Sequence, residues 1–222
     1  MTDAGRVGCL IPAYEAADTV GGMVRLCLRH VERVLVVDDG SRDATAREAR
    51  RAGAQVLRHG ANRGKGAALA SGFTRALALG WEAAVCLDAD GQHDPIEIPA
   101  VVSAWRRGGW DVVVGNRLGD PSGMSFARLA TNRVTSRIVS ALARRPVADS
   151  QCGYRLVSAR AMAGVRPGER RFAMEGEFLI RAARAGLRIG QVPVRSRYAR
   201  GGSHIRPLAD TLRFLRMAAA FV

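Results

Sequence analysis

Short apolar segments alternate along this chain with segments of helical periodicity, and this alternation constrains the fold more than any other feature. The strand-like segments are Val7–Ile11, Val34–Val37, Val56–Leu57, Ala83–Leu87 and Asp111–Gly115. Helical spacing or helix-end signals mark the segments between them, at about 20–31, 44–52, 66–79 and from 94 onward. Strands that are apolar on both faces are typical of a parallel sheet covered on both sides by helices. The sequence therefore predicts a Rossmann-like, mostly parallel α/β sheet in a single domain.

Particular residues mark the ends of the predicted helices. Gly53 and Gly80 follow two of the helical segments and suit the C-cap position. Asp94 suits an N-cap, with Pro95 as the first helical residue and Glu97 completing a capping box.

After Arg117 the character of the sequence changes. The expected elements are a basic helix over Ser125–Ala143, a short strand or loop over Asp149–Ser158, a helix over Phe178–Ala185, a strand over Arg188–Val194 and a final helix over Leu208–Val222. The last helix is amphipathic, with Leu208, Leu212, Leu215 and Ala218 predicted on one face. We interpret the chain as one domain with a specialised C-terminal third.

The chain is strongly basic, with 34 Lys and Arg against 20 Asp and Glu and a formal charge of +14. Such a surface favours nucleic acid, anionic lipid headgroups or phosphorylated small molecules. Lys65 is the one lysine, so a genome that prefers Arg is an alternative source of the excess. A non-catalytic module that binds nucleic acid is disfavoured, because acidic strand ends interrupt a phosphate-tracking face and only 3 Tyr, 6 Phe and 3 Trp are present for stacking.

The cysteines indicate a reducing compartment. Cys9, Cys27, Cys86 and Cys152 are widely scattered and form no C-x-x-C pair. We therefore expect the cytoplasm. Neither a signal peptide nor an apolar run long enough to span a membrane is visible in the sequence.

Polar clusters follow three of the predicted strands. They are Pro12-Ala13-Tyr14-Glu15, Asp38-Asp39-Gly40-Ser41 and Asp88-Ala89-Asp90-Gly91-Gln92-His93. In open α/β sheets ligands bind beyond the carboxyl ends of the strands. Helix capping explains Asp94 but not four further acids, so their coincidence at one edge predicts a binding site.

Asp88, Asp90 and Gln92 place oxygen atoms at alternate positions of an extended segment. Oxygen ligands suit Mg²⁺ or Mn²⁺, which also neutralise crowded carboxylates and share their coordination with a ligand's phosphates. The alternative is an acidic loop neutralised by arginine side chains. D-x-D alone is a weak pattern.

The segment Asn62–Ala68 combines glycines with the single lysine. Gly64 and Gly66 open a predicted helix after a strand, which permits a phosphate-binding turn. The segment is neither a Walker A loop nor a dinucleotide fingerprint. Lys65 either reaches a phosphate or is a solvated side chain at a glycine-rich helix start.

Taken together, these clusters resemble the family 2 glycosyltransferases of the GT-A fold, and among them the dolichol- or polyprenyl-phosphate mannosyltransferase and glucosyltransferase group. The matching pieces are "IPAYEAADTV", "VVDDGSRDAT", "NRGKGAAL", "LDADGQHDP", "GNR", "DSQCGYRLVS", "MEGEFLIRAARAGLRIGQVPV" and "GGSHIRP". They occur in the family's order and cover nearly all of residues 7–210. The resemblance implies a GT-A fold and inverting, metal-dependent transfer of a hexose from a nucleotide sugar.

The resemblance also implies a donor-binding part at about residues 1–117. Within it Asp90 takes the metal that bridges the diphosphate, Gln92 is a further ligand, and Asp88 faces the ribose, the sugar or the metal. The residues expected at the donor nucleotide are Pro12, Tyr14, Glu15, Asp39, Lys65 and Asp88. GDP-mannose and UDP-glucose are both compatible donors.

The acceptor-binding part implied by the resemblance is about residues 118–222, and the implied acceptor is a polyprenyl phosphate. An ionised phosphate needs cations rather than a general base. The residues expected at the acceptor or the diphosphate are Arg117, Arg133, Gln151, Arg155, Arg200, Ser203 and Arg206, each arginine being equally compatible with a surface role. "GGSHIRP" resembles a loop that closes on the diphosphate, with His204 in place of a lysine.

Glu175 and Glu177 precede an apolar helix, where the family carries an acid. Glu177 matches that pattern better, so the predicted catalytic set is Asp90, Glu177 and Arg117. The alternative is a hydroxyl acceptor, a polysaccharide or small metabolite, with Glu177 as general base. His59 and His93 have no partner cluster in the sequence and receive no role.

The basic C-terminal third and the amphipathic last helix indicate a partner outside the active site. We expect the protein to lie peripherally on an anionic membrane surface at the cytoplasmic face.

Overall fold

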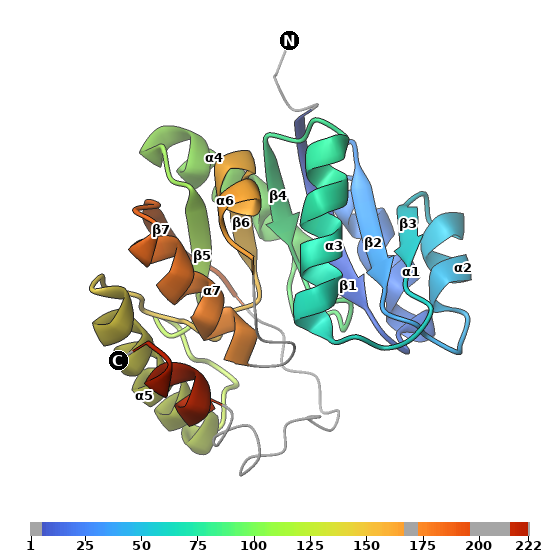
Figure 1. Ribbon diagram of the computed structural model, residues 1–222. Helices are drawn as coiled ribbons and strands as arrows, with labels where there is room; N and C mark the ends of the chain where they lie inside the picture. The colour runs from blue at the N-terminus through green and yellow to red at the C-terminus, as the bar shows by residue number, and fades with distance from the viewer. Residues whose placement is uncertain (1–5, 167–172, 196–213, 222) are drawn as a thin grey trace.

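The computed structural model describes residues 6–166, 173–195 and 214–221. Their strands form one seven-stranded sheet in the order β3-β2-β1-β4-β6-β5-β7 (Figure 1). The strands are β1 (Val7–Ala13), β2 (Val34–Asp38), β3 (Gln55–Arg58), β4 (Ala83–Cys86), β5 (Val112–Asn116), β6 (Arg155–Ser158) and β7 (Ile189–Pro193). β6 runs antiparallel to β4 and β5, whereas the other neighbours are parallel. The predicted mostly parallel α/β sheet in a single domain is confirmed.

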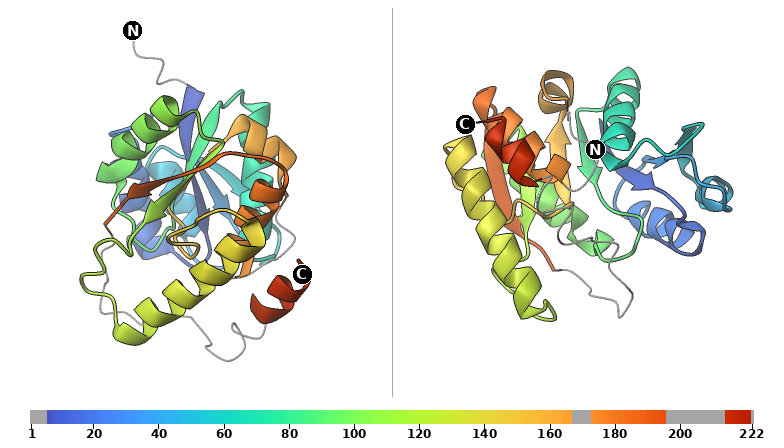
Figure 2. Two further views of the ribbon diagram at one scale, coloured as in Figure 1. Left: turned by 90° about the vertical axis from the view of Figure 1, so that its left-hand side faces the viewer. Right: turned by 60° about the horizontal axis from the view of Figure 1, so that its bottom comes forward.

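Helices cover both faces of this sheet. They are α1 (Ala17–Cys27), α2 (Thr45–Arg51), α3 (Lys65–Ala78), α4 (Ile98–Gly108), α5 (Phe126–Ala143), α6 (Ala159–Gly164) and α7 (Ala173–Arg184), with a 3-10 turn, η2 (Pro95–Glu97), before α4. The sheet stands between α1 and α4 on one side and α3, α6 and α7 on the other (Figures 1 and 2). α5 packs against α7 at the outer edge. Over the described ranges, each helix is too short or too polar to cross a bilayer.

The antiparallel strand β6 carries the loop before it to the binding edge of the sheet. Although it follows β5 in the chain, β6 lies between β4 and β5, with Arg155 opposite Cys86. Because β6 starts where β4 ends, residues 149–154 lie at the carboxyl end of β4. The segment predicted as a strand or loop is therefore a loop followed by a four-residue strand.

The predicted helix ends agree largely with the structure. Gly53 and Gly80 have φ angles of 101° and 72°, which is the left-handed conformation expected after a helix. The Asp94 carboxylate accepts a hydrogen bond from the Ile96 amide, although the helix opens with a 3-10 turn. α7 begins before the predicted Phe178, because Met174 is buried on the same face one turn earlier.

The predicted final helix is described in part. Residues 214–219 are helical, whereas Leu208 and Leu212 lie outside the described residues. The buried side chains are Phe214, Met217 and Ala218, and Leu215 is half exposed. The predicted apolar face was therefore wrong at Leu215, because packing against α5 and α7 selects the Phe214 side of the helix. A Cβ atom on Gly176 of α7 would lie 3.0 Å from Val139 of α5 and 3.5 Å from Phe214.

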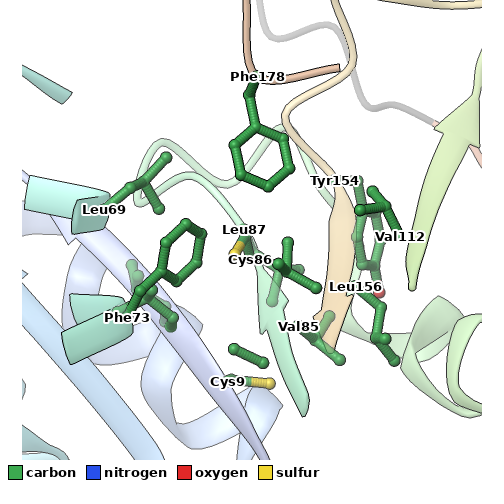
Figure 3. Packing of buried hydrophobic residues seen from close by; sticks show 14 of the residues in the cluster. Cys9, Leu69, Phe73, Val85, Cys86, Leu87, Val112, Tyr154, Leu156 and Phe178 are labelled. Atoms are coloured by element: carbon green, nitrogen blue, oxygen red, sulfur yellow. The ribbon is translucent and has the colours of Figure 1, made fainter. Parts of the chain in front are cut away.

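The core lies between the sheet and its helices, and it supports the carboxyl ends of the central strands. All seven residues of β1 are buried. On the α3 side the rings of Phe73 and Phe178 meet at 6.1 Å between centroids, over Cys86 and Leu87 (Figure 3). This aromatic contact joins α3 to α7 directly beneath the polar strand ends. The apolar packing thus fixes the platform on which the polar clusters stand.

Gly72 of α3 offers a test of this packing. A Cβ atom at Gly72 would lie 2.4 Å from Cδ1 of buried Leu10, so we expect Gly72→Ala to lower the free energy of unfolding by about 1–3 kcal/mol through overpacking. Gly22→Ala is the matched control, because a Cβ on this α1 glycine meets nothing within 4 Å. There the gain in helix propensity predicts a stabilisation of up to about 1 kcal/mol. Urea unfolding measures both, and equal effects would contradict the close approach.

Candidate active site

The polar clusters predicted to meet do meet, at the carboxyl ends of β1, β2 and β4. The turn after β1 and the turn after β2 are hydrogen-bonded to each other: the Glu15 amide donates to Ser41 Oγ at 2.9 Å, and the Arg42 amide donates to Glu15 Oε1 at 2.8 Å. Tyr14 is half exposed beside them, and Pro12 points into the site from β1. One rim of the site is therefore built from sequence clusters more than twenty residues apart.

Lys65 is the centre of the site. It begins α3, and its Nζ lies 2.6 Å from Asp88 Oδ1 at the end of β4 and 2.7 Å from Glu175 Oε1 in the first turn of α7. Burial lowers the pKa of Lys65, but the charges of Asp88 and Glu175 outweigh it and raise that pKa. Burial raises the pKa of Asp88, and the Lys65 ammonium outweighs it and holds the pKa at about 2. Lys65 and Asp88 are therefore both charged at neutral pH.

A small cavity lies beneath this cluster, and its walls come from α3, α7 and the ends of β1, β4 and β6. Its volume is about 20 Å³, room for about one water molecule. Glu175 Oε2 is buried and has no hydrogen-bond partner among the described residues. The remaining lining residues are Pro12, Leu69, Phe73, Cys86, Leu87, Gly153, Arg155, Val157, Met174 and Phe178.

Position 153, just after Cys152 at this edge, has no room for a side chain, which explains the glycine there. A Cβ atom there would lie 2.8 Å from Asp88 Oδ2 and 3.1 Å from Lys65 Nζ. Any larger residue would press on the charge cluster. The loop before β6 thus closes the site from the side opposite β1.

The predicted metal ligands differ in their surroundings. Asp88 is paired with Lys65, whereas Asp90 is exposed and accepts a hydrogen bond from the Gln92 amide at 2.9 Å. In the part of the chain that the structure describes, no group of three His, Cys, Asp or Glu side chains could hold a metal ion. The carboxylate and amide oxygens fit Mg²⁺ or Mn²⁺, which are usually held by one or two carboxylates, waters and the substrate's phosphates.

Asp39, predicted at the nucleotide base, is engaged inside the protein. Its two oxygens accept hydrogen bonds from the amides of Arg63 and Gly64, at 2.6–3.1 Å. Oδ1 also lies 2.6 Å from Nδ1 of His59. In this structure Asp39 therefore holds the turn before Lys65.

The two histidines that received no role both have partners at this edge, so the sequence interpretation was wrong there. His59 bonds to Asp39 and lies 3.0 Å from Ser71 Oγ. Buried His93 accepts a hydrogen bond from the Asp88 amide at 3.2 Å. Burial lowers the pKa of His93 despite the nearby charge of Asp88. The signal that could have found these residues is their position immediately after a strand or within the D-x-D loop.

Two of the five arginines predicted to bind phosphate, Arg117 and Arg155, are engaged within the protein. Buried Arg117 forms a two-point ion pair with Asp149, at 2.7 and 2.9 Å. Arg155 is also buried, and its nitrogens donate to the carbonyls of Ser150, Cys152 and Glu175. In this structure both guanidinium groups hold the loop before β6, and their predicted roles at a phosphate stay predictions.

The remaining acceptor candidates are dispersed. Arg133 is exposed on α5, and the Gln151 side chain donates to Ser150 Oγ. Neither lines the cavity. Arg200, Ser203 and Arg206 lie outside the described residues.

Glu177 requires a correction in position. Its carboxylate is buried and pairs with Arg181, one turn later in α7, at 2.7 Å, and it does not line the cavity. Residues two apart on a helix point to different sides, so only one of the pair can face Lys65. The acid that does so is Glu175.

Comparison with known proteins identifies the family. The sequence matches the family model described as Glycosyl transferase family 2 over residues 9–164, well over half of the chain. The chain belongs to glycosyltransferase family 2.

This glycosyltransferase is similar over most of its length to relatives with named activities. It is 31% identical over 212 residues to the UDP-N-acetylglucosamine–dolichyl-phosphate N-acetylglucosaminyltransferase of Methanococcus voltae, covering 85% of this chain and 84% of that protein. It is 29% identical over 204 residues to the undecaprenyl-phosphate mannosyltransferase of Micrococcus luteus, covering 85% and 82%.

Solved structures show the same fold. Glucosyl-3-phosphoglycerate synthase from Mycobacterium tuberculosis, in complex with UDP, matches with a TM-score of 0.78 at 21% identity, covering 98% of this chain and 80% of that chain. Other structures of that synthase contain UDP with Mn²⁺ or with Mg²⁺. The predicted GT-A fold of the family 2 enzyme is confirmed.

Replacing Lys65 tests the centre of the site. We expect Lys65→Met to lower the free energy of unfolding by about 1–3 kcal/mol, because two carboxylates lose their shared partner. Arg75→Met is the control, since Arg75 is an exposed cation on the same helix. Urea unfolding compares the two variants with the parent protein. A Lys65→Met protein as stable as Arg75→Met would contradict a structural role for the ammonium.

Proposed function

We propose that this family 2 enzyme is an inverting, metal-dependent glycosyltransferase that moves a hexose from a nucleotide sugar to a polyprenyl phosphate. The observation that carries the proposal is the charged cluster of Lys65, Asp88 and Glu175 beside exposed Asp90 at the strand ends. The names of the relatives from Methanococcus voltae and Micrococcus luteus support a polyprenyl-type phosphate acceptor. GDP-mannose and UDP-glucose are the candidate donor types.

The donor lies across the ends of β1, β2 and β4 in this proposal. Asp90 and Gln92, with Asp88 at the inner side, would hold Mg²⁺ or Mn²⁺, which stabilises negative charge on the departing diphosphate. Tyr14 and Glu15 border the nucleotide. Lys65 contributes a cation that is already oriented, so little reorganisation accompanies the growth of charge on the leaving group.

The acceptor chemistry follows from the charges. A phosphate is ionised at neutral pH and attacks without losing a proton to the protein, so the reaction needs no general base. The predicted alternative, a hydroxyl acceptor with Glu177 as base, is disfavoured because Glu177 is buried against Arg181.

The division of the chain into parts about 1–117 and 118–222 belongs to the same proposal, with one amendment. Glu175 comes from the acceptor part and contacts Lys65 of the donor part. The two parts therefore share the cluster, and residue 117 marks no boundary between separate sites.

α5 supplies the surface that we assign to the anionic membrane. This 18-residue helix contains no acidic residue, and it lies at the edge of the molecule (Figure 2). Its exposed face carries Arg133 and Arg137 together with Phe126, which is 85% exposed, and Val134, which is 53% exposed. Cations beside exposed apolar side chains suit the headgroup region of an anionic leaflet. Arg133 then contacts lipid headgroups rather than the transferred phosphate.

Sugar transfer tests the reaction directly. Radiolabelled sugars from a panel of nucleotide donors are offered to a short-chain polyprenyl phosphate with Mn²⁺, with Mg²⁺ and with EDTA. We expect label in the lipid product, abolished by EDTA and reduced at least about 100-fold in Asp90→Ala, because the metal's charge stabilisation is lost. The configuration of the product at the anomeric carbon reports inversion.

Glu32→Ala is the control for this assay, because Glu32 is an exposed acid before β2 at the opposite edge of the sheet. It should transfer sugar at the parent rate. Metal-dependent hydrolysis of one donor without lipid product would replace the phosphate acceptor by a hydroxyl acceptor. A folded protein that neither transfers nor hydrolyses would contradict the proposed reaction.

Vesicle sedimentation tests the membrane surface. Reversing two charges with Arg133→Glu/Arg137→Glu should weaken binding to vesicles of anionic lipid about tenfold or more, since each basic residue contributes about 1 kcal/mol near such a surface. Arg25→Glu/Arg29→Glu, on α1 and the turn that follows it, is the control of equal charge change. Equal loss in both variants would show that net charge, not the α5 face, governs the binding.

A further inference from the structure

His59 follows β3 and joins three separate elements of the donor-side edge. Its amide donates to the Asp38 carbonyl at 2.8 Å, which continues the pairing of β3 with β2. Its Nδ1 lies 2.6 Å from Asp39 Oδ1, and its Nε2 lies 3.0 Å from Ser71 Oγ on α3. His59 is buried, with its side chain 6% exposed, so these contacts are shielded from water.

The contact with Asp39 has a fixed direction. The Asp39 carboxylate already accepts hydrogen bonds from two backbone amides, those of Arg63 and Gly64. Because these carboxylate oxygens act as acceptors, we infer that Nδ1 of His59 carries the proton and donates it. The two ring nitrogens therefore make different contacts: Nδ1 donates to Asp39, and Nε2 contacts Ser71 of α3.

Asp39 in turn fixes the turn that precedes Lys65. Gly64 has φ 92° and ψ 157°, a conformation that favours glycine, and its amide donates to Asp39 Oδ2 at 2.6 Å. Gly40 packs against the same segment so closely that a Cβ atom would lie 2.4 Å from the carbonyl carbon of Ala61. The next residue after Gly64 is Lys65, whose ammonium bridges the two carboxylates of the site.

We propose that His59 is a positioning residue of the donor site, which acts through Asp39 and the Arg63–Gly64 turn to place Lys65. The proposal rests on the function proposed above. His59 touches neither donor nor acceptor in this arrangement. Its effect is transmitted by the hydrogen bond from Nδ1 to Asp39, whereas the Nε2 contact with Ser71 only completes the packing. The two nitrogens can be separated by substitution.

A pair of amide variants makes that separation. His59→Asn places an N–H near the position of Nδ1, and His59→Gln places one near the position of Nε2. We expect His59→Asn to keep the KM for the nucleotide sugar within about threefold of the parent value. His59→Gln should raise that KM about tenfold or more and also lower kcat, with a smaller change in the acceptor KM, because without the hydrogen bond to the Asp39 carboxylate the turn no longer places Lys65 at the donor and its departing diphosphate. Ser71→Ala, which removes the Nε2 partner, should behave like the parent.

Amide exchange gives a readout that does not depend on activity. By NMR, the amide protons of Arg63 and Gly64 should exchange faster with solvent in His59→Gln than in His59→Asn or Ser71→Ala. If both histidine variants fail to fold, Asp39→Asn against Ser71→Ala provides the same comparison, with faster exchange expected only for Asp39→Asn. Equal exchange and equal donor KM in the Asn and Gln variants would overturn the proposal.

Different results would disprove the proposed function and the proposed role of His59. A parent protein that transfers no sugar from any donor would remove the proposed function, while the exchange rates would still judge the contact between His59 and Asp39. An active parent enzyme with indistinguishable His59→Asn and His59→Gln variants would retain the function and remove the positioning role.

Discussion

The candidate site depends on a single ammonium group that lies between two carboxylates. Asp88 lies two residues after the central strand β4 and Glu175 lies in the first turn of α7, so their negative charges would repel each other where the two elements meet. Lys65, delivered by α3, converts that repulsion into two short ion pairs. The contact joins elements separated by 110 residues in the chain. The ion pairs of Lys65 therefore hold α7 over the strand ends and also set the electrostatics of the site.

The charged cluster is stable in that position because apolar packing supports it from below. The rings of Phe73 and Phe178, shown in Figure 3, come from the same two helices that supply Lys65 and Glu175, and they line the same cavity as those two residues. Their contact sets the distance between α3 and α7 independently of the charges. Antiparallel β6 then closes the third side, because its leading loop places Gly153 against Asp88.

The sequence predicted the features that depend on local pattern. Apolar runs and helical spacing depend on neighbouring residues, so the α/β fold and the meeting of the strand ends followed from them. Partners distant in the chain leave no such pattern. The bond between His59 and Asp39 spans 20 residues, and the pairing of Arg117 with Asp149 spans 32. The choice of Glu175 over Glu177 also needed the structure, because periodicity shows that they face different sides but not which side faces Lys65.

Two acids follow the buried strand β4 of this basic protein, and their surroundings differ. Asp88 lies just after β4, and the turn that begins at Ala89 separates it from Asp90. Asp88 turns inward to Lys65, so its charge is balanced within the protein and contributes to docking α7. Asp90 remains exposed and hydrogen-bonded only to its own loop in the contacts described here, so its charge is still available to a cation. Of two acids two residues apart, one is therefore paired within the protein and the other is exposed at the edge of the site.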